Sequence, residues 1–262
     1  MANTGYIIYT YKDTNPYSET YGHTKEERVY DTELCPINIE PRPYKVLLLK
    51  NGVDDYTETC GTDNRLDLDA ICNNIETTTA QSYVMYVGDC TTTIYDSVRH
   101  YGDIMTRNYN IVKIDMANNY VTTIDNYGLS GLQYVTNIIL SKNIITIGDN
   151  AFQSNKNWTN SVVLNKVKTI GKKAFHYCNS LTDITLGADV TTIGQEAFNS
   201  CYNLVSFTIN ATTPPTLGTS AFGNINNLTI YVPDESVDAY SQATNWSNYY
   251  NNIKPLSEKI IK

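Results

Sequence analysis

The sequence predicts a β-rich repeat solenoid with a small β-rich module before it and a helical cap after it. Three observations predict this fold: an internal period of 23 residues, short alternating apolar and polar segments inside each period, and a last stretch with helical spacing. The period is visible in KTIGKKAFHYCNSL at 168–181 and TTIGQEAFNSCYNL at 191–204. A coil of this length cannot bury its own apolar residues, so the coils must stack.

The regular coils share a set of positions. An apolar residue precedes glycine, an Ala-Phe pair follows, and a three-residue alternating segment is expected to form a strand with two residues in and one out. The glycines are expected where the backbone has positive φ or approaches its neighbour closely, and the Ala-Phe pair is expected on a short helical turn. The apolar, glycine and aromatic positions are Ile147, Ile170, Ile193, Leu217, Gly148, Gly171, Gly194, Gly218, Phe152, Phe175, Phe198 and Phe222.

No motif predicts catalysis, a metal or a cofactor. The six cysteines form no C-x-x-C pair, the three histidines are far apart, and phosphate-binding, hydrolase and metalloprotease motifs are absent. Cys178 and Cys201 occupy a repeat position that holds Leu, Asn or Ile in other coils, so they are interpreted as packing thiols and not as nucleophiles. Asp67 and Asp69 are interpreted as a solvated acidic face, with a calcium site as the alternative. We therefore expect no enzyme.

The pattern T-I-G-x-x-A-F-x-x-C-x-x-L resembles the BspA-type leucine-rich repeat of bacterial surface antigens, over about residues 82–256. The resemblance implies a curved right-handed solenoid that is used for binding. It divides the chain into a strand pair at 1–40, a small β-rich connecting module at 41–81, the solenoid at 82–232 and a C-terminal cap at 233–262.

In the predicted cap, Pro233 should stop strand pairing, and Asp234 or Ser236 should cap a helix. One face of that helix would carry Val237, Tyr240 and Ala243. Trp246, Tyr249, Tyr250 and Ile253 would then cover the open end of the last coil, or alternatively form an aromatic ligand site.

Residues 1–40 hold two alternating segments, GYIIYTYKD and KEERVYDT, that predict a strand pair. Residues 5–36 resemble N-terminal segments of virion proteins of Bacteroides phages, including crAss-like phages. That resemblance implies a docking arm, with a homo-oligomer formed through the arm as a further expectation; a capping subdomain for the solenoid is the alternative. The tyrosines expected to dock are Tyr6, Tyr9, Tyr11, Tyr17, Tyr21 and Tyr30.

Charge and hydropathy exclude other classes of partner. Of the formal net charge of −8, residues 1–81 carry −7, which disfavours nucleic acid. No apolar run is long enough to predict membrane insertion, and the start of the sequence lacks the pattern of a signal peptide. Together with the resemblance of residues 5–36, the missing signal pattern favours a phage particle, in the capsid or the tail, as the location. The alternative is a bacterial cell-surface adhesin from which a signal or anchor was removed.

Binding is expected on the outward side of the predicted strands. The expected partners are other virion proteins, or a glycan or protein of the host surface. The alternative is an ordinary solvated sheet face. The outward residues are Ile139, Val163, Thr185, Thr208 and Tyr231, flanked by Asn137 and Asp183.

Overall fold

The computed structural model describes residues 6–12, 24–30, 44–50, 53–59, 65–68, 71, 83–89, 91–95, 111–117 and 120–259. The chain divides into two compact units, Met1–Pro41 and Arg42–Lys262. The first unit contains an antiparallel hairpin of β1 (Tyr6–Lys12) and β2 (Thr24–Tyr30). Each unit is described by itself.

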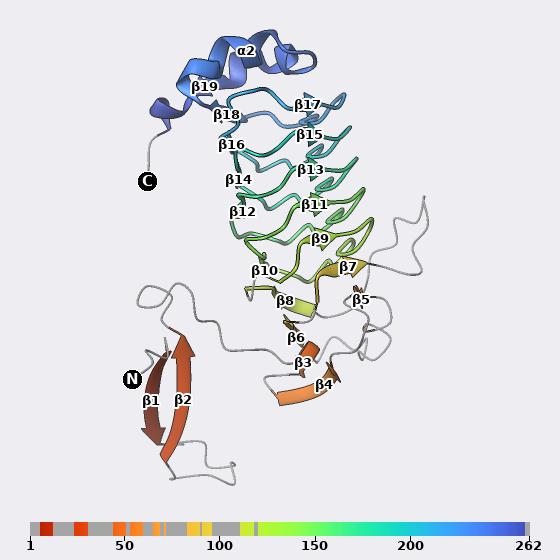
Figure 1. The fold of residues 1–262 in the computed structure, drawn as a ribbon, viewed down its shortest axis with the longest axis vertical. Coiled ribbons are helices and arrows are strands. Elements are labelled where there is room, and N and C mark those ends of the chain that lie inside the picture. Colours follow the sequence, from red (N-terminus) through yellow and green to blue (C-terminus); the bar gives the residue numbers. More distant parts are fainter. Residues whose placement is uncertain are drawn as a thin grey trace. The chain divides into compact units, whose positions relative to one another are not determined.

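The second unit is a stack of coils with two ladders of strands (Figure 1). One ladder is a parallel sheet of seven very short strands, in the order β17-β15-β13-β11-β9-β7-β5. In the regular coils it runs through the Thr-Ile or Thr-Leu step before the glycine, which the sequence did not predict as a strand. Its strands are Arg65–Asp67 (β5), Thr93–Tyr95 (β7), Thr123–Ile124 (β9), Thr146–Ile147 (β11), Thr169–Ile170 (β13), Thr192–Ile193 (β15) and Thr216–Leu217 (β17).

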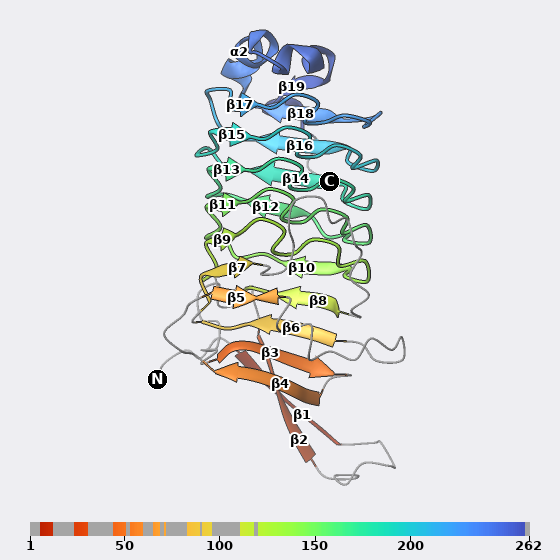
Figure 2. The same ribbon diagram turned by 90° about the vertical axis from the view of Figure 1, so that its right-hand side faces the viewer.

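The other ladder contains the predicted strands and is interrupted once, so it forms two five-stranded sheets. Their orders are β10-β8-β6-β3-β4 and β12-β14-β16-β18-β19, and Figure 2 shows both beside the short-strand sheet. The strands are Tyr44–Lys50 (β3), Val53–Thr59 (β4), Tyr83–Val87 (β6), Ile111–Asp115 (β8), Asn137–Ile139 (β10), Val162–Leu164 (β12), Asp183–Leu186 (β14), Ser206–Ile209 (β16), Thr229–Val232 (β18) and Ile253–Pro255 (β19).

The segment predicted as a connecting module, 41–81, shares its sheets with the solenoid. Strand β3 pairs antiparallel with both β4 and β6, and β5 pairs in parallel with β7. The repeat-poor start of this unit thus continues the same ladders, although its sequence lacks the 23-residue pattern.

The repeated apolar positions form the core. The residue before each glycine and the phenylalanine that follows are buried in every regular coil. The rings stack from coil to coil, with centroids 5.0 Å apart for Phe152 and Phe175, 5.1 Å for Phe175 and Phe198, and 5.5 Å for Phe198 and Phe222. Burying one such side chain contributes about 1.5–3 kcal/mol, so the stack is a main source of stability.

The Ala-Phe segments are turns, and the prediction of helical turns is wrong. In a helix each N–H would bond within the segment, whereas here alternate N–H groups donate to the next coil. In one coil Lys173 N bonds Gln195 O at 2.9 Å, Phe175 N bonds Ala197 O at 2.7 Å, and Tyr177 N bonds Asn199 O at 3.2 Å. This geometry requires positive φ at non-glycine residues, 54° at Lys173 and 62° at Tyr177. These segments therefore form a third hydrogen-bonded ladder.

The repeat glycines are required by close approach. None of Gly148, Gly171, Gly194 and Gly218 has positive φ, which makes that half of the expectation wrong. A Cβ on Gly171 would lie 2.5 Å from the carbonyl carbon of Gly148 and 2.6 Å from the amide nitrogen of Asp149. Neighbouring coils are thus in backbone contact here, and no larger residue fits.

The two repeat cysteines donate hydrogen bonds inside the core. Sγ of Cys178 lies 3.1 Å from Phe152 O, and Sγ of Cys201 lies 3.1 Å from Phe175 O. Asn155, which occupies the same position in the preceding coil, donates from Nδ2 to Leu129 O at 2.8 Å. The carbonyl acceptor is 26 residues earlier in all three cases, so the position supplies a donor and not only apolar volume.

The chain after β18 forms η1 (Asp234–Ser236), α2 (Val237–Gln242), η2 (Trp246–Asn252), β19 and η3 (Leu256–Glu258). Tyr240 and Trp246 are buried and donate to Ala211 O and Pro215 O at 2.8 and 2.7 Å. This segment thus packs its aromatic residues on the last coils.

Two details of the predicted cap are wrong. Tyr250 is 62% exposed and does not cover the end of the stack. Neither Asp234 nor Ser236 caps a helix with its side chain, and Asp234 instead accepts from Ser257 N at 3.0 Å. The prediction for Pro233 is confirmed, since β18 ends at Val232 and the sheet gains its next strand only at β19, where Ile253 pairs with Ile230.

We predict that Gly171→Ala destabilises the solenoid by about 1–3 kcal/mol, since its new methyl group overlaps the backbone of the preceding coil. The measurement is urea unfolding followed by circular dichroism. Gly223→Ala is the matched control, because its closest contact is the terminal nitrogen of the Asn199 side chain, which can rotate away. Equal losses in the two variants would contradict the close-approach explanation.

A second prediction concerns pH. Burial raises the pKa of Cys178 and raises the pKa of Cys201 to about 12. The folded state therefore keeps a neutral thiol while the unfolded state ionises near its ordinary value, so stability is lost as pH rises from about 9 toward 12. Between about pH 8.5 and about pH 10.5 the wild type should lose roughly 2 kcal/mol more than Cys201→Ser, whose hydroxyl does not titrate. Parallel losses in urea unfolding would contradict the assignment.

Candidate functional site

The described residues form surfaces suited to binding, and they contain no evident group of side chains arranged for catalysis. Among them no three His, Cys, Asp or Glu side chains are grouped to hold a metal ion. The thiols of Cys178 and Cys201 are buried, and their raised pKa values keep them protonated. Within the same described part of the chain, no helix is long and apolar enough to cross a membrane.

The predicted binding face is built by the sheet β12-β14-β16-β18-β19, here called the strand face. Pairing places Val163, Thr185, Thr208 and Tyr231 in one row, because each is the register partner of the next. The residues on either side of each row position are buried in the core, so the row points outward. Val163, at 48% exposure, is the most open of these outward side chains.

Ile139 does not belong to the same sheet. It lies in β10, which pairs with β8, and the ladder stops between β10 and β12. The side chain of Asn160 bridges this gap, with Oδ1 accepting from Ile138 N and Nδ2 donating to Ile138 O, both at 3.0 Å. The expected row from Ile139 to Tyr231 is therefore split after its first member.

Asn137 shares β10 with Ile139 and is partly exposed. Its Oδ1 atom is buried and has no hydrogen-bond partner among the described residues. The amide oxygen is thus turned away from solvent, which limits what Asn137 can offer to a partner.

Thr208 is only 4% exposed, so the expectation that it lies on an open face is wrong. Lys259, from the C-terminal tail, donates from Nζ to Thr208 Oγ1 at 2.8 Å. The same Nζ lies 3.5 Å from Asp183 Oδ2 and 5.7 Å from the centroid of the Tyr231 ring. Three of the predicted binding residues thus surround one ammonium group of the chain itself. Lys259 was missed because it lies outside the repeat and no period places it.

The structure describes the backbone of only some of the tyrosines in the expected docking arm. In the hairpin, Tyr6 pairs with Tyr30, while Tyr9 and Tyr11 stand opposite Glu27 and Lys25. Tyr17 and Tyr21 lie outside the described residues.

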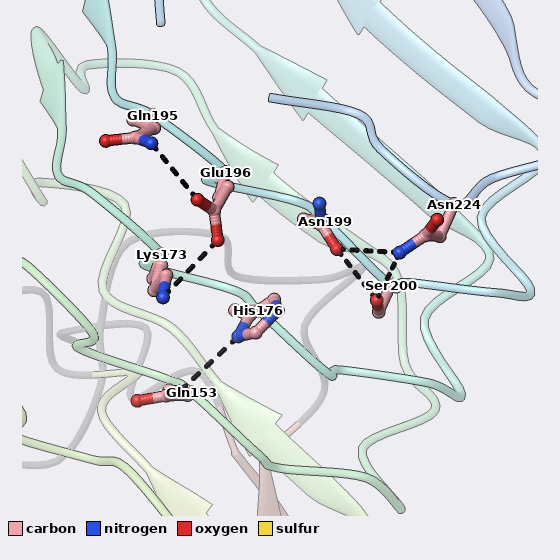
Figure 3. A network of polar contacts seen from close by, with 8 residues as sticks. All are labelled: Gln153, Lys173, His176, Gln195, Glu196, Asn199, Ser200 and Asn224. Atoms are coloured by element: carbon pink, nitrogen blue, oxygen red, sulfur yellow. Dashed lines mark hydrogen bonds and ion pairs between the residues drawn. The ribbon is translucent and has the colours of Figure 1, made fainter. Parts of the chain in front are cut away.

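The turns carry a network of polar side chains that joins adjacent coils (Figure 3). Lys173 Nζ lies 3.3 Å from Glu196 Oε2, and Gln153 Nε2 lies 3.4 Å from His176 Nδ1. Burial, and secondly the charge of Lys173, lower the pKa of His176, so the imidazole stays neutral at pH 7.

Further along this network, Asn224 donates from Nδ2 to Asn199 Oδ1 at 3.3 Å and to Ser200 Oγ at 3.2 Å. The Ser200 hydroxyl in turn donates to Asn199 Oδ1 at 2.7 Å. Ser200 is buried, and its hydroxyl group is hydrogen-bonded within this network. The polar groups of this network therefore connect neighbouring coils and do not form a separate binding site.

The comparison with known families agrees with the repeat. Residues 102–229 match the BspA type leucine rich repeat region in six copies. None of the curated proteins compared with the chain matches it significantly. The matched range is shorter than the 82–256 expected from the sequence and covers just under half of the chain. Residues 102–229 are therefore a region of BspA-type leucine-rich repeats, an architecture that indicates a binding or adhesion repeat protein.

Proposed function

We propose that this is a non-enzymatic binding protein that contacts its partner with the open part of the strand face. The observation that carries the proposal is the row at Val163 and Thr185, on a rigid sheet whose core side is fully packed. Preorganised side chains lose little conformational entropy on binding. An exposed aliphatic group beside a hydroxyl suits contact with a protein or a glycan surface.

The proposed setting is a virion component of a phage, in the capsid or tail, that docks through residues 1–40 and displays the solenoid toward the host surface. Support comes from the resemblance of residues 5–36 and from the division of the chain after Pro41. Among the described strands, β1 and β2 pair only with each other, and a two-stranded ribbon by itself is marginally stable in water. This favours a role in which β1 and β2 pack against another protein or a second copy. A BspA-like adhesin of the bacterial surface is the alternative setting.

The first test places charge on the strand face. Val163→Lys combined with Thr185→Lys should reduce binding of fluorescently labelled protein to bacterial cells at least tenfold, since two ammonium groups must be desolvated at the contact. The matched control combines Ile145→Lys with Thr169→Lys, an aliphatic and a hydroxyl residue that are exposed beside and within the short-strand sheet. Equal losses, or none in either variant, would refute binding by the strand face.

The second test removes residues 1–41. The thermal unfolding midpoint of the remaining unit should change by less than about 3 °C, because residues 42–262 form a compact unit by themselves. Capture of virion proteins from particle lysates should be abolished. Undiminished capture would contradict the docking arm, and capture of bacterial envelope components instead would favour the adhesin setting.

A further inference from the structure

The C-terminal tail crosses the strand face after the last strand has joined the sheet. β19 pairs with β18, η3 (Leu256–Glu258) reverses the chain, and Lys259 then reaches β16 and β14. One lysine thus contacts residues from three neighbouring strands. This contact covers the part of the row that contains Thr208 and Tyr231, and it leaves Val163 exposed.

The three groups around the Lys259 ammonium are chemically complementary to it. Asp183 supplies a carboxylate oxygen, Thr208 supplies a hydroxyl acceptor, and Tyr231 supplies the face of an aromatic ring. A primary ammonium has three donors and a compact charge, so it can use a carboxylate, a hydroxyl and a ring together. We call these three residues the ammonium site.

The sheet, and not the tail, positions the ammonium site. Thr208 is the register partner of both Thr185 and Tyr231, and Asp183 is the partner of Ser206, two residue pairs away. All three side chains therefore stand on hydrogen-bonded strands whose inner neighbours are packed in the core. Strand pairing therefore fixes the backbone of the ammonium site without any contribution from Lys259.

We propose that the ammonium site binds a lysyl side chain of a protein partner and that Lys259 occupies it in the free protein. The inference rests on the proposed function only in placing the partner on the strand face. Tail and partner are then mutually exclusive, so displacement of the tail opens the strand face from β12 to β18. A neutral glycan carries no cation and would not use this site.

The test uses the full chain with Lys259→Ala and the probe Nα-acetyl-lysine N-methylamide. Amide resonances of Thr208 and Tyr231 should shift saturably, with a Kd on the order of 10 mM, since one partly exposed ion pair and one cation–π contact are each weak. Nα-acetyl-norleucine N-methylamide, which lacks the ammonium, should produce no such shift. Adding Asp183→Asn to the variant should weaken lysine binding at least fivefold.

Wild type and Lys156→Ala should bind the probe at least fivefold more weakly than Lys259→Ala, because their tails compete at high effective concentration. Lys156 is an exposed lysine outside the strands of the strand face and controls for loss of a positive charge. Equal binding in the wild type, or no lysine-specific shift in a folded Lys259→Ala protein, would overturn the proposal and leave the tail a structural strap. Loss of cell binding in the strand-face variant would still support the proposed function in that case.

Discussion

Hydrogen bonds between the main chains of successive coils determine the rest of the structure. They run along three sides of each coil: the short-strand sheet, the longer strands and the turns with alternating φ. The coils are therefore held at the spacing of paired strands, about 4.8 Å. The ring centroids of Phe152, Phe175 and Phe198 follow at 5.0 and 5.1 Å, so the aromatic stack takes its spacing from the backbone. The same spacing leaves no room for a side chain at Gly171.

The core could be predicted from sequence because every coil meets the same neighbour. Ile170 and Phe175 are buried where Ile193 and Phe198 are buried, and a repeated environment repeats the residue. The turns were harder to predict than the core, because the spacing of Ala174, Phe175 and Cys178 also fits one turn of helix. Five of the seven short strands span only two residues, which is too few for an alternating pattern to be recognised.

The sequence was sufficient to predict which residues of the candidate site point outward, but not which of them are exposed to solvent. Alternation places Val163, Thr185 and Thr208 outward in any register that buries their neighbours. Whether such a residue meets solvent depends on segments that obey no repeat, and the tail that covers Thr208 is one of them. The strand face is consequently divided into an open part around Val163 and a covered part around Tyr231, which have different chemistry.

The hydrogen bonds of the Asn160 side chain lie where the spacing of the longer strands departs from 23 residues. Ile138 and Val162 are 24 residues apart, Val162 and Ile184 only 22, and the following step to Phe207 is again 23. On the opposite side, Ile124, Ile147, Ile170 and Ile193 keep steps of 23 throughout. An extra residue on one side is thus absorbed within a single coil, and an amide side chain substitutes for the missing strand pairing. Such an array can change loop length on one side while the repeat length on the other side stays constant. Its surface can therefore vary without changes to the core.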